Sequence, residues 1–315
     1  MNVLQEIHAA ATRLQPYLNP TLLTYSQYFS HLTGCEVYLK CEHLQATGSF
    51  KIRGALNRIL SLTPQEKAQG VIAASTGNHG LAVAFAAKLA KVPATIFLPE
   101  TTPAFKLNAI TWEGVHIQLV PGDCLAVEKL ARQKAQSQNK TFISPYNDLQ
   151  VIAGQGTIGV ELADAKLDAV FISMGGGGLL SGIGTFLKSV SPATQMIACW
   201  PENAPALYEC LKAGKIIEVP EKPTLSDATA GGLEPNAITL ELCQKLIDKQ
   251  ILISENDLKS AMRLAAEYEH WIIEGAAAVA LGAFLNHATD YTGKKVGIVI
   301  CGRNIAFETF QKATQ

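Results

Sequence analysis

The sequence has few charged residues and no cluster of basic ones. Lysine and arginine number 26 against 27 aspartates and glutamates, so the formal net charge is −1, and charged residues make up only 17% of the chain. Proteins that bind nucleic acids gather basic residues on one face, so we expect no nucleic-acid partner. A sparsely charged surface with 48% apolar residues is compatible with a homodimer or larger homo-oligomer.

Several signatures of exported, membrane-bound and metal-dependent proteins are also missing. The N-terminus has no basic-then-apolar signal. The seven cysteines are an odd number without metal-ligand spacing, which is typical of reduced thiols in the cytoplasm. The longest uncharged run, 169–187, is interrupted by four glycines, so we expect no membrane span. These absences predict a cytoplasmic protein without a membrane partner.

Short apolar runs rich in β-branched residues alternate with stretches of helical character. We expect strands at 37–39, 71–74, 94–98, 116–120, 169–173, 196–199 and 296–300. Such alternation is typical of an α/β fold with parallel sheets and helices on both faces. At 315 residues the chain is long enough for two lobes.

Lys51 stands where a lysine can act as a nucleophile. It follows the loop-forming stretch 47–49, which is rich in N-cap residues, and opens the helical run 52–60. A lysine amine is nucleophilic only when desolvation or a nearby charge removes its proton. Lys51, beside Phe50 at the start of a packed helix, is therefore a candidate for a covalent bond to an aldehyde, although a lone lysine at a helix start is more often a surface residue.

A loop made only of glycine stands between a predicted strand and a predicted helix. Residues 175–178 follow the apolar strand 169–173, and the helix extends to about residue 188. Successive backbone N–H groups at a helix N-terminus bind anions. Four consecutive glycines cost more backbone entropy than an ordinary turn requires, so this loop predicts a phosphate site.

A second polar loop precedes an alanine-rich helix expected over 81–90. Residues 74–80 read Ala-Ser-Thr-Gly-Asn-His-Gly and follow the strand at 71–74. Small polar residues at a helix N-terminus suit a carboxylate ligand, and the Asn78 side-chain amide can donate to a phenolate-type oxygen. An ordinary capping turn is equally compatible, and His79 alone is more typical of a packed histidine than of a general base.

One glycine pattern points elsewhere. Residues 154–159 match G-x-G-x-x-G, the pattern of dinucleotide-binding loops. The preceding apolar run covers only 151–153, and residues 175–180 stand where an acidic residue should bind the ribose. A dehydrogenase is therefore disfavoured.

Four motifs occur in an order that is similar to that of one known family. They are Ser-Phe-Lys-Ile-Arg-Gly-Ala at 49–55, Ser-Thr-Gly-Asn-His-Gly at 75–80, Val-Ile-Ala-Gly-Gln-Gly-Thr at 151–157 and Gly-Gly-Gly-Gly-Leu-Leu-Ser-Gly at 175–182. The pattern resembles the serine/threonine dehydratase and serine racemase family. Its members are pyridoxal-phosphate (PLP) enzymes of the tryptophan-synthase-β type, called fold type II. The resemblance extends from about residue 20 to residue 306.

The resemblance implies a two-lobed α/β fold and a set of site residues. A large PLP-binding lobe would comprise residues 1–63 and 147–315, and a small mobile lobe residues 64–146. The residues implied to bind the cofactor are Phe50, Lys51, Asn78, Gly175, Gly176, Gly177, Gly178, Leu179 and Cys301. Those implied to bind an amino-acid substrate are Ser75, Thr76, Gly77 and His79.

Cys301 follows the predicted strand 296–300, where family members face the cofactor's ring nitrogen with a hydroxyl or a thiol. Such a group leaves the nitrogen largely unprotonated, which favours prompt expulsion of a β-substituent. The next residues, Gly-Arg-Asn at 302–304, depart from the common Gly-Gly-Asn. Together with Ser-Thr-Gly-Asn-His and with Glu-Gly-Ala at 274–276, they are similar to dehydratases assigned to hydroxyectoine breakdown.

The implied reaction is the dehydration and deamination of a β-hydroxy amino acid, such as L-threonine or L-serine, to a 2-keto acid and ammonia. Lys51 would anchor the cofactor and act as general base. Two alternatives stay open: a serine-type racemase, since Thr76 stands where racemases carry a catalytic serine, and a dehydratase of a hydroxyectoine-derived amino acid or of 3-hydroxyaspartate. The intact Lys51 disfavours a catalytically silent binding protein. No metal is expected, because Trp200 and Ala206 stand where metal-binding relatives place carboxylates.

Overall fold

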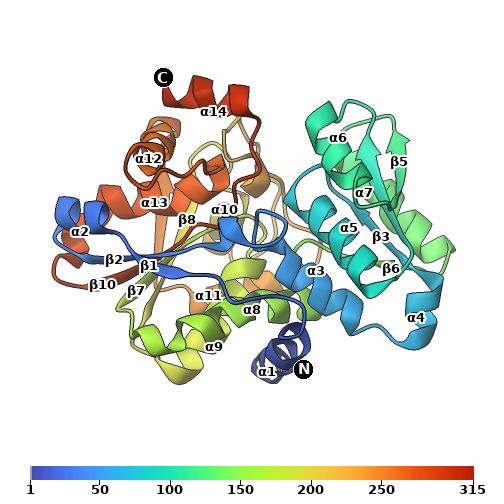
Figure 1. Ribbon diagram of the computed structural model, residues 1–315, viewed down its shortest axis with the longest axis horizontal. Helices are drawn as coiled ribbons and strands as arrows, with labels where there is room; N and C mark the ends of the chain where they lie inside the picture. Colours follow the sequence, from blue (N-terminus) through green and yellow to red (C-terminus); the bar gives the residue numbers. More distant parts are fainter. Residues whose placement is uncertain (1) are drawn as a thin grey trace.

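Two separate β-sheets organise the chain (Figure 1). The computed structural model describes residues 2–315, apart from the side chain of Cys124. The larger sheet has the strand order β1-β2-β10-β7-β8-β9, and the smaller has β5-β4-β3-β6. Strands β1 and β2 pair antiparallel, and the other neighbours in both sheets pair in parallel.

The elements have the following bounds. The strands are β1 Leu23–Tyr25, β2 Glu36–Lys40, β3 Val71–Ala74, β4 Ala94–Pro99, β5 His116–Val120, β6 Thr141–Phe142, β7 Ala169–Ser173, β8 Gln195–Pro201, β9 Lys249–Ile253 and β10 Lys295–Val299. The α-helices are α1 Val3–Leu14, α2 Gln27–Thr33, α3 Lys51–Leu60, α4 Pro64–Gln69, α5 Asn78–Ala90, α6 Ala104–Thr111, α7 Cys124–Ser137, α8 Leu149–Leu162, α9 Gly178–Val190, α10 Ala206–Ala213, α11 Thr239–Leu246, α12 Glu255–Tyr268, α13 Gly275–His287 and α14 Phe307–Thr314. Short 3₁₀ turns lie at η1 Glu42–Leu44, η2 Ala163–Ala165, η3 Asp227–Thr229 and η4 Ala288–Tyr291.

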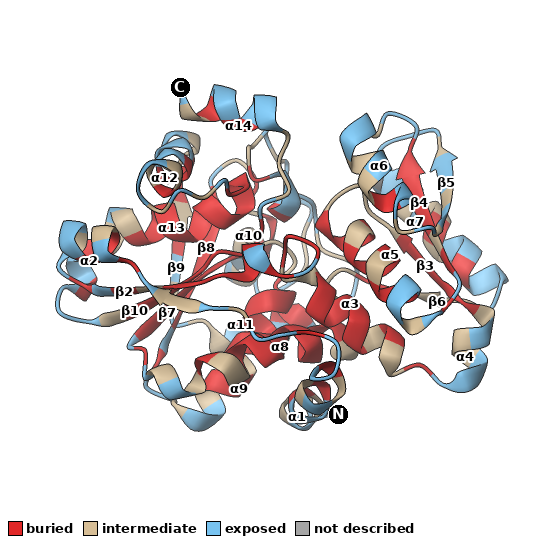
Figure 2. Ribbon diagram, in the orientation of Figure 1, coloured by how far each residue is buried: buried red, intermediate tan, exposed pale blue. Residues whose placement is uncertain are grey.

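Helices cover both faces of the larger sheet. Helix α13 contacts β7, β8, β9 and β10, whereas α9 contacts β7 and β8, and Figure 1 shows the two helices on opposite sides of the strands. All five residues of β7 are buried, as expected for a parallel strand covered on both faces. Figure 2 shows the same concentration of burial in α8, α13 and the central strands. The predicted α/β architecture is confirmed.

The smaller sheet is also covered on both faces, and alternate residues of β3 show this directly. Val71 and Ala73 belong to the apolar cluster that includes α5, whereas Ile72 packs with Phe97 and with α7. Successive side chains of a strand point to opposite faces. The two helices therefore lie on opposite faces of this sheet.

The glycines at 154–159 lie inside α8 and serve helix packing, so the dinucleotide-loop alternative is wrong. A Cβ on Gly154 would lie 2.6 Å from the Cα of Gly54 in α3. A Cβ on Gly182 of α9 would lie 2.5 Å from the backbone nitrogen of Gly156. Helix α8 is thus pressed between the helix that begins with Lys51 and the helix that follows the glycine loop.

The seven predicted strands are all present, and three further strands, β1, β6 and β9, were not predicted from the sequence. Helix α5 begins at Asn78, ahead of the expected residue 81. Within residues 2–315, no helix combines the length and apolar character needed to cross a membrane.

Candidate active site

Lys51 is the first residue of α3, and the preceding chain differs from the expected polar cap. The N-cap is Phe50, whose backbone is already helical and whose side chain makes no capping bond. Ser49 forms an isolated antiparallel bridge with Gly302, and the Phe50 N–H donates to the Cys301 carbonyl at 3.1 Å. These backbone contacts hold the start of α3 against the end of β10, which brings Cys301 next to Lys51.

The amine of Lys51 is desolvated by burial. Its Nζ donates to the Pro145 carbonyl at 3.0 Å and lies 5.2 Å from the centroid of the Phe50 ring. Burial lowers the pKa of Lys51 to about 8, although nearby Cys301 and Glu274 act in the opposite direction. This amine therefore loses its proton more readily than the amine of an exposed lysine. The lowered pKa agrees with the sequence-based expectation of a desolvated lysine, and the reactivity of Lys51 stays a prediction.

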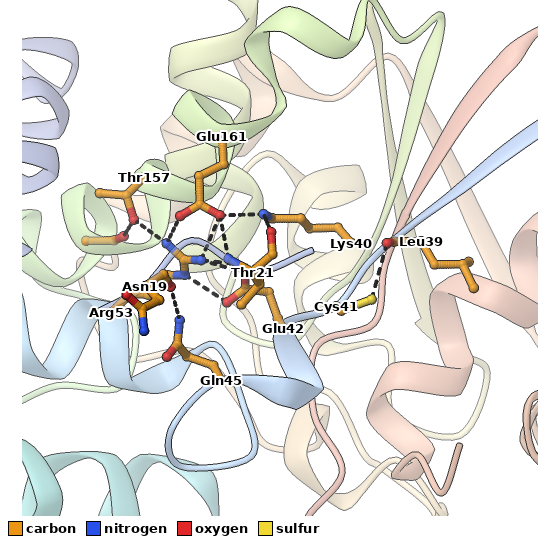
Figure 3. Close-up of polar contacts among 11 residues, drawn as sticks. Asn19, Thr21, Leu39, Lys40, Cys41, Glu42, Gln45, Arg53, Thr157 and Glu161 are labelled. Carbon is orange, nitrogen blue, oxygen red and sulfur yellow. Dashed lines mark hydrogen bonds and ion pairs between the residues drawn. The ribbon is translucent and has the colours of Figure 1, made fainter. Parts of the chain in front are cut away.

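A buried ion network fixes the first turn of α3 (Figure 3). Two guanidinium nitrogens of Arg53 donate to Glu42 at 2.8 Å each, and a third contact reaches Glu161 at 2.5 Å. Lys40 of β2 donates to the same Glu161. Removing one member of such a network leaves an uncompensated buried charge, which costs about 3–5 kcal/mol. The network therefore ties the helix turn that carries Lys51 to β2 and α8.

Residues 175–177 of the all-glycine loop lie between β7 and α9, Gly178 is the first residue of α9, and neighbouring groups leave little or no room for side chains. A Cβ on Gly176 would lie 2.4 Å from the ring of Tyr146, and a Cβ on Gly175 would lie 3.1 Å from the backbone of Thr229. Gly177 has a φ of 85°, in the region that favours glycine. The glycine backbone leads directly into the N-terminus of α9. The backbone N–H groups of the loop and of the first turn of α9 therefore form a set of donors that fits a phosphate group.

Two adjacent cavities meet at Lys51. All nine residues predicted to bind the cofactor line the first cavity, namely Phe50, Lys51, Asn78, Gly175, Gly176, Gly177, Gly178, Leu179 and Cys301. The four predicted substrate residues, Ser75, Thr76, Gly77 and His79, line the second, whose volume is about 250 Å³. Lys51, Asn78, Pro145 and Ala228 line both cavities. An amine at this junction can reach groups held in either cavity.

Asn78 is held by two residues that the sequence did not single out as site residues. Its Nδ2 donates to the two Glu274 oxygens at 2.7 and 3.0 Å, and its Oδ1 accepts from Asn304 Nδ2 at 2.6 Å. Burial raises the pKa of Glu274 to about 7, although the donors Asn78 and Asn304 oppose this. These contacts fix which way the amide faces. Donation from Asn78 to a ring oxygen of the cofactor stays a prediction.

The remaining polar groups are mostly neutral. His79 is buried with Nε2 2.8 Å from the Ile143 carbonyl, and burial lowers its pKa to about 3, so it is an uncharged, packed histidine. Burial raises the pKa of Cys301 well above its usual range, so this residue presents a neutral thiol to the first cavity. Ser75 Oγ accepts from the Gly77 N–H at 3.2 Å, which closes the turn before α5.

The site can be compared with known proteins. The family profile described as pyridoxal-phosphate dependent enzyme matches residues 14–302. An L-threonine ammonia-lyase of Thermotoga maritima is 39% identical over 97% of this chain and 76% of its own length. A serine racemase of Dictyostelium discoideum is 37% identical over 98% of this chain and 97% of its own. The structure of threonine deaminase isoform 2 from Solanum lycopersicum superposes with a TM-score of 0.94 at 30% identity, covering 99% of this chain and 91% of that one.

The chain belongs to the family of pyridoxal-phosphate dependent enzymes, and its fold is fold type II. The residues present fit this cofactor: a lysine amine with lowered pKa, a side-chain-free loop at a helix N-terminus and a neutral thiol surround one cavity. When bound, PLP supplies an electron sink joined to the substrate's amino group.

Proposed function

We propose that this protein is an ammonia-lyase that dehydrates and deaminates a β-hydroxy amino acid such as L-threonine or L-serine. The products are a 2-keto acid and ammonia, and the water lost on elimination is regained on hydrolysis. The position of the Lys51 amine, at the junction of a phosphate-binding cavity and a cavity lined by the polar loop 75–79, carries this proposal. The names of two relatives, an L-threonine ammonia-lyase and a threonine deaminase, support it.

Each part of the site has a proposed role. Lys51 anchors the cofactor and, once released, takes the α-proton of the substrate as general base, for which its lowered pKa is suited. The loop of Ser75, Thr76, Gly77 and His79 binds the substrate carboxylate at the N-terminus of α5. Loop 175–178 and the start of α9 bind the phosphate. Asn78 faces the ring oxygen and Cys301 the ring nitrogen.

Three features of the wider molecule belong to the same proposal. We infer a mobile small lobe of residues 64–146 on a large lobe of 1–63 and 147–315, because the smaller sheet is built from strands between Val71 and Phe142. We infer a homodimer or larger homo-oligomer. A cytoplasmic location is supported by the six cysteines whose side chains are described, which are buried free thiols.

The substrate is tested by measuring keto-acid and ammonia release from the PLP-loaded enzyme across a panel of β-hydroxy amino acids. L-threonine and L-serine are expected among the substrates, with equal amounts of the two products. The panel includes 3-hydroxyaspartate and amino acids derived from hydroxyectoine, because the sequence left these open. Absence of keto acid from every member would refute the proposed function.

Thr76 is the residue at which the elimination and racemisation proposals make different predictions. It lines the substrate cavity and is only half-buried, so its hydroxyl can approach the substrate. We expect elimination to dominate, because the extra methyl of threonine stiffens and crowds this position, and we expect Thr76→Ala to change keto-acid formation by less than about tenfold. Chiral chromatography beside the keto-acid assay checks this. The racemase alternative wins if D-isomer accumulates faster than keto acid and Thr76→Ala removes only that activity.

Divalent cations are expected to be dispensable. Trp200 is fully buried in β8, and Ala206 opens α10, so neither offers a ligand oxygen from its side chain. Among residues 2–315, no three His, Cys, Asp or Glu side chains with described positions form a group able to hold a metal ion. Activity after treatment with a chelator should equal that of untreated enzyme. A loss that magnesium reverses would contradict this expectation.

A further inference from the structure

Residues 144–147, the crossover segment, lie between β6 and α8, and Pro145 of this segment lines both cavities. The Pro145 carbonyl accepts the hydrogen bond from the Lys51 amine at 3.0 Å. The Tyr146 ring lies so close to Gly176 that a Cβ there would be 2.4 Å from it. The position of this crossover segment therefore sets the place of the amine and of the glycine loop together.

A single residue from a distant loop holds the crossover segment. Glu234, which lies between η3 and α11, accepts from Ser144 Oγ at 2.7 Å and from Asn147 Nδ2 at 3.0 Å, through different carboxylate oxygens. Its backbone N–H donates to the Tyr146 hydroxyl at 2.6 Å. The two ends of the segment and its aromatic ring are thus bound to one amino acid.

Glu234 is also bound by a residue of α7, the helix that packs on one face of the smaller sheet. Arg132 of α7 forms an ion pair with Glu234 at 2.6 Å, and its guanidinium lies 4.1 Å from the centroid of the Phe142 ring in β6. The Glu234 side chain is 14% exposed, so its charge is largely shielded from solvent. Charge-assisted hydrogen bonds in such surroundings are shorter and stronger than neutral ones. The carboxylate therefore joins the large lobe, the crossover segment and α7.

We propose that Glu234 is a positioning residue of the active site. It holds the crossover segment so that the Pro145 carbonyl faces the Lys51 amine and the Tyr146 ring supports the glycine loop. Catalysis depends on groups held within a fraction of an ångström, and a displacement of 1 Å from a distant change costs about a hundredfold in rate. The kinetic part of this proposal rests on the proposed function, whereas cofactor affinity does not.

The test compares Glu234→Ala, Glu234→Gln and Arg132→Met with Glu241→Gln, a matched control on the exposed surface of α11. PLP is titrated into cofactor-free protein to obtain its dissociation constant, kcat is measured on the loaded enzyme, and thermal unfolding is recorded. Glu234→Ala should weaken PLP binding about tenfold and lower kcat about a hundredfold. Glu234→Gln and Arg132→Met keep part of the contacts and should show smaller losses, and the control none.

A purely structural role would lower the melting temperature of Glu234→Ala but leave the PLP affinity and kcat of the folded protein unchanged, and that result would overturn the proposal. Should Glu234→Ala fail to fold, Tyr146→Phe takes its place, because it removes only the hydroxyl that accepts from Glu234. Wild-type PLP affinity and kcat in Tyr146→Phe would then refute the proposal. If PLP affinity falls while the wild type forms no keto acid, the positioning role stands and the proposed function fails.

Discussion

Lys51→Ala should abolish turnover while the protein still folds. One amine serves as covalent anchor and as general base, so its loss should lower kcat by about 10⁴-fold or more. The alanine removes a partner from the Pro145 carbonyl but leaves the ion network of Arg53 intact, so α3 should remain in place. Keto-acid formation and the melting temperature are the two measurements.

The matched control for this variant is Lys259→Ala, which removes an exposed lysine from α12. It should retain wild-type activity. Keto acid formed at the wild-type rate by a folded Lys51→Ala preparation would show that another group performs the chemistry.

Gly176→Ala should abolish tight PLP binding. The added Cβ would lie 2.4 Å from the Tyr146 ring, a distance that real Cβ atoms essentially never show. The ring cannot move aside freely, because its hydroxyl accepts from the Glu234 N–H at 2.6 Å. The loop must shift instead, and its N–H groups then lose their alignment toward a phosphate. We expect PLP affinity to fall by about a hundredfold, equivalent to about 2.7 kcal/mol, as measured by titration of cofactor-free protein.

Gly232→Ala provides the control for this substitution, because a Cβ at Gly232 meets no atom within 4 Å. The same methyl is added there without a clash, so PLP affinity should not change. If Gly176→Ala binds PLP as tightly as this control, the glycine loop does not form the phosphate site.

Strands covered on both faces were predicted with good bounds, and so was the more exposed edge strand β5 at residues 116–120. Residues 71–74 and 169–173 are apolar runs, and their predicted bounds agree with β3 and β7. The strands that were missed, β1, β6 and β9, are edges of the two sheets. Fewer side chains of an edge strand are buried, so the apolar runs that would predict these three strands are short or absent. Strand β6, for example, consists of only Thr141 and Phe142, both half-buried.

The early start of α5 shows tertiary contacts overriding local preference. Asn78, His79 and Gly80 are poor helix formers, which favoured a later start. In the structure Asn78 is bound by Glu274, and His79 by the Ile143 carbonyl. Those hydrogen bonds hold both residues in the helical turn, and no local sequence pattern predicts the bonds.

The site residues that belong to the family motifs could be predicted from the sequence, but the residues that hold them in place could not. Glu274 directly precedes the apolar run of α13, and an isolated acidic residue at such a place indicates a possible functional role. Its partner Asn78 lies 196 positions away, so the sequence does not predict their contact. Glu234 stands in a loop without regular structure, and nothing local connects it to Tyr146. Contacts between such distant positions arise only when the two sheets are assembled.

The attachment point of the cofactor is the most direct test of the role of Lys51. Lys51 and Lys106 both line the substrate cavity, and Lys106 is instead paired with Asp227 at 3.0 Å. Borohydride reduction of the PLP-loaded enzyme makes the lysine linkage permanent, and peptide mapping by mass spectrometry then locates it. We expect the phosphopyridoxyl group on Lys51 alone. Modification of Lys106 or another lysine, with Lys51 unmodified, would contradict this assignment.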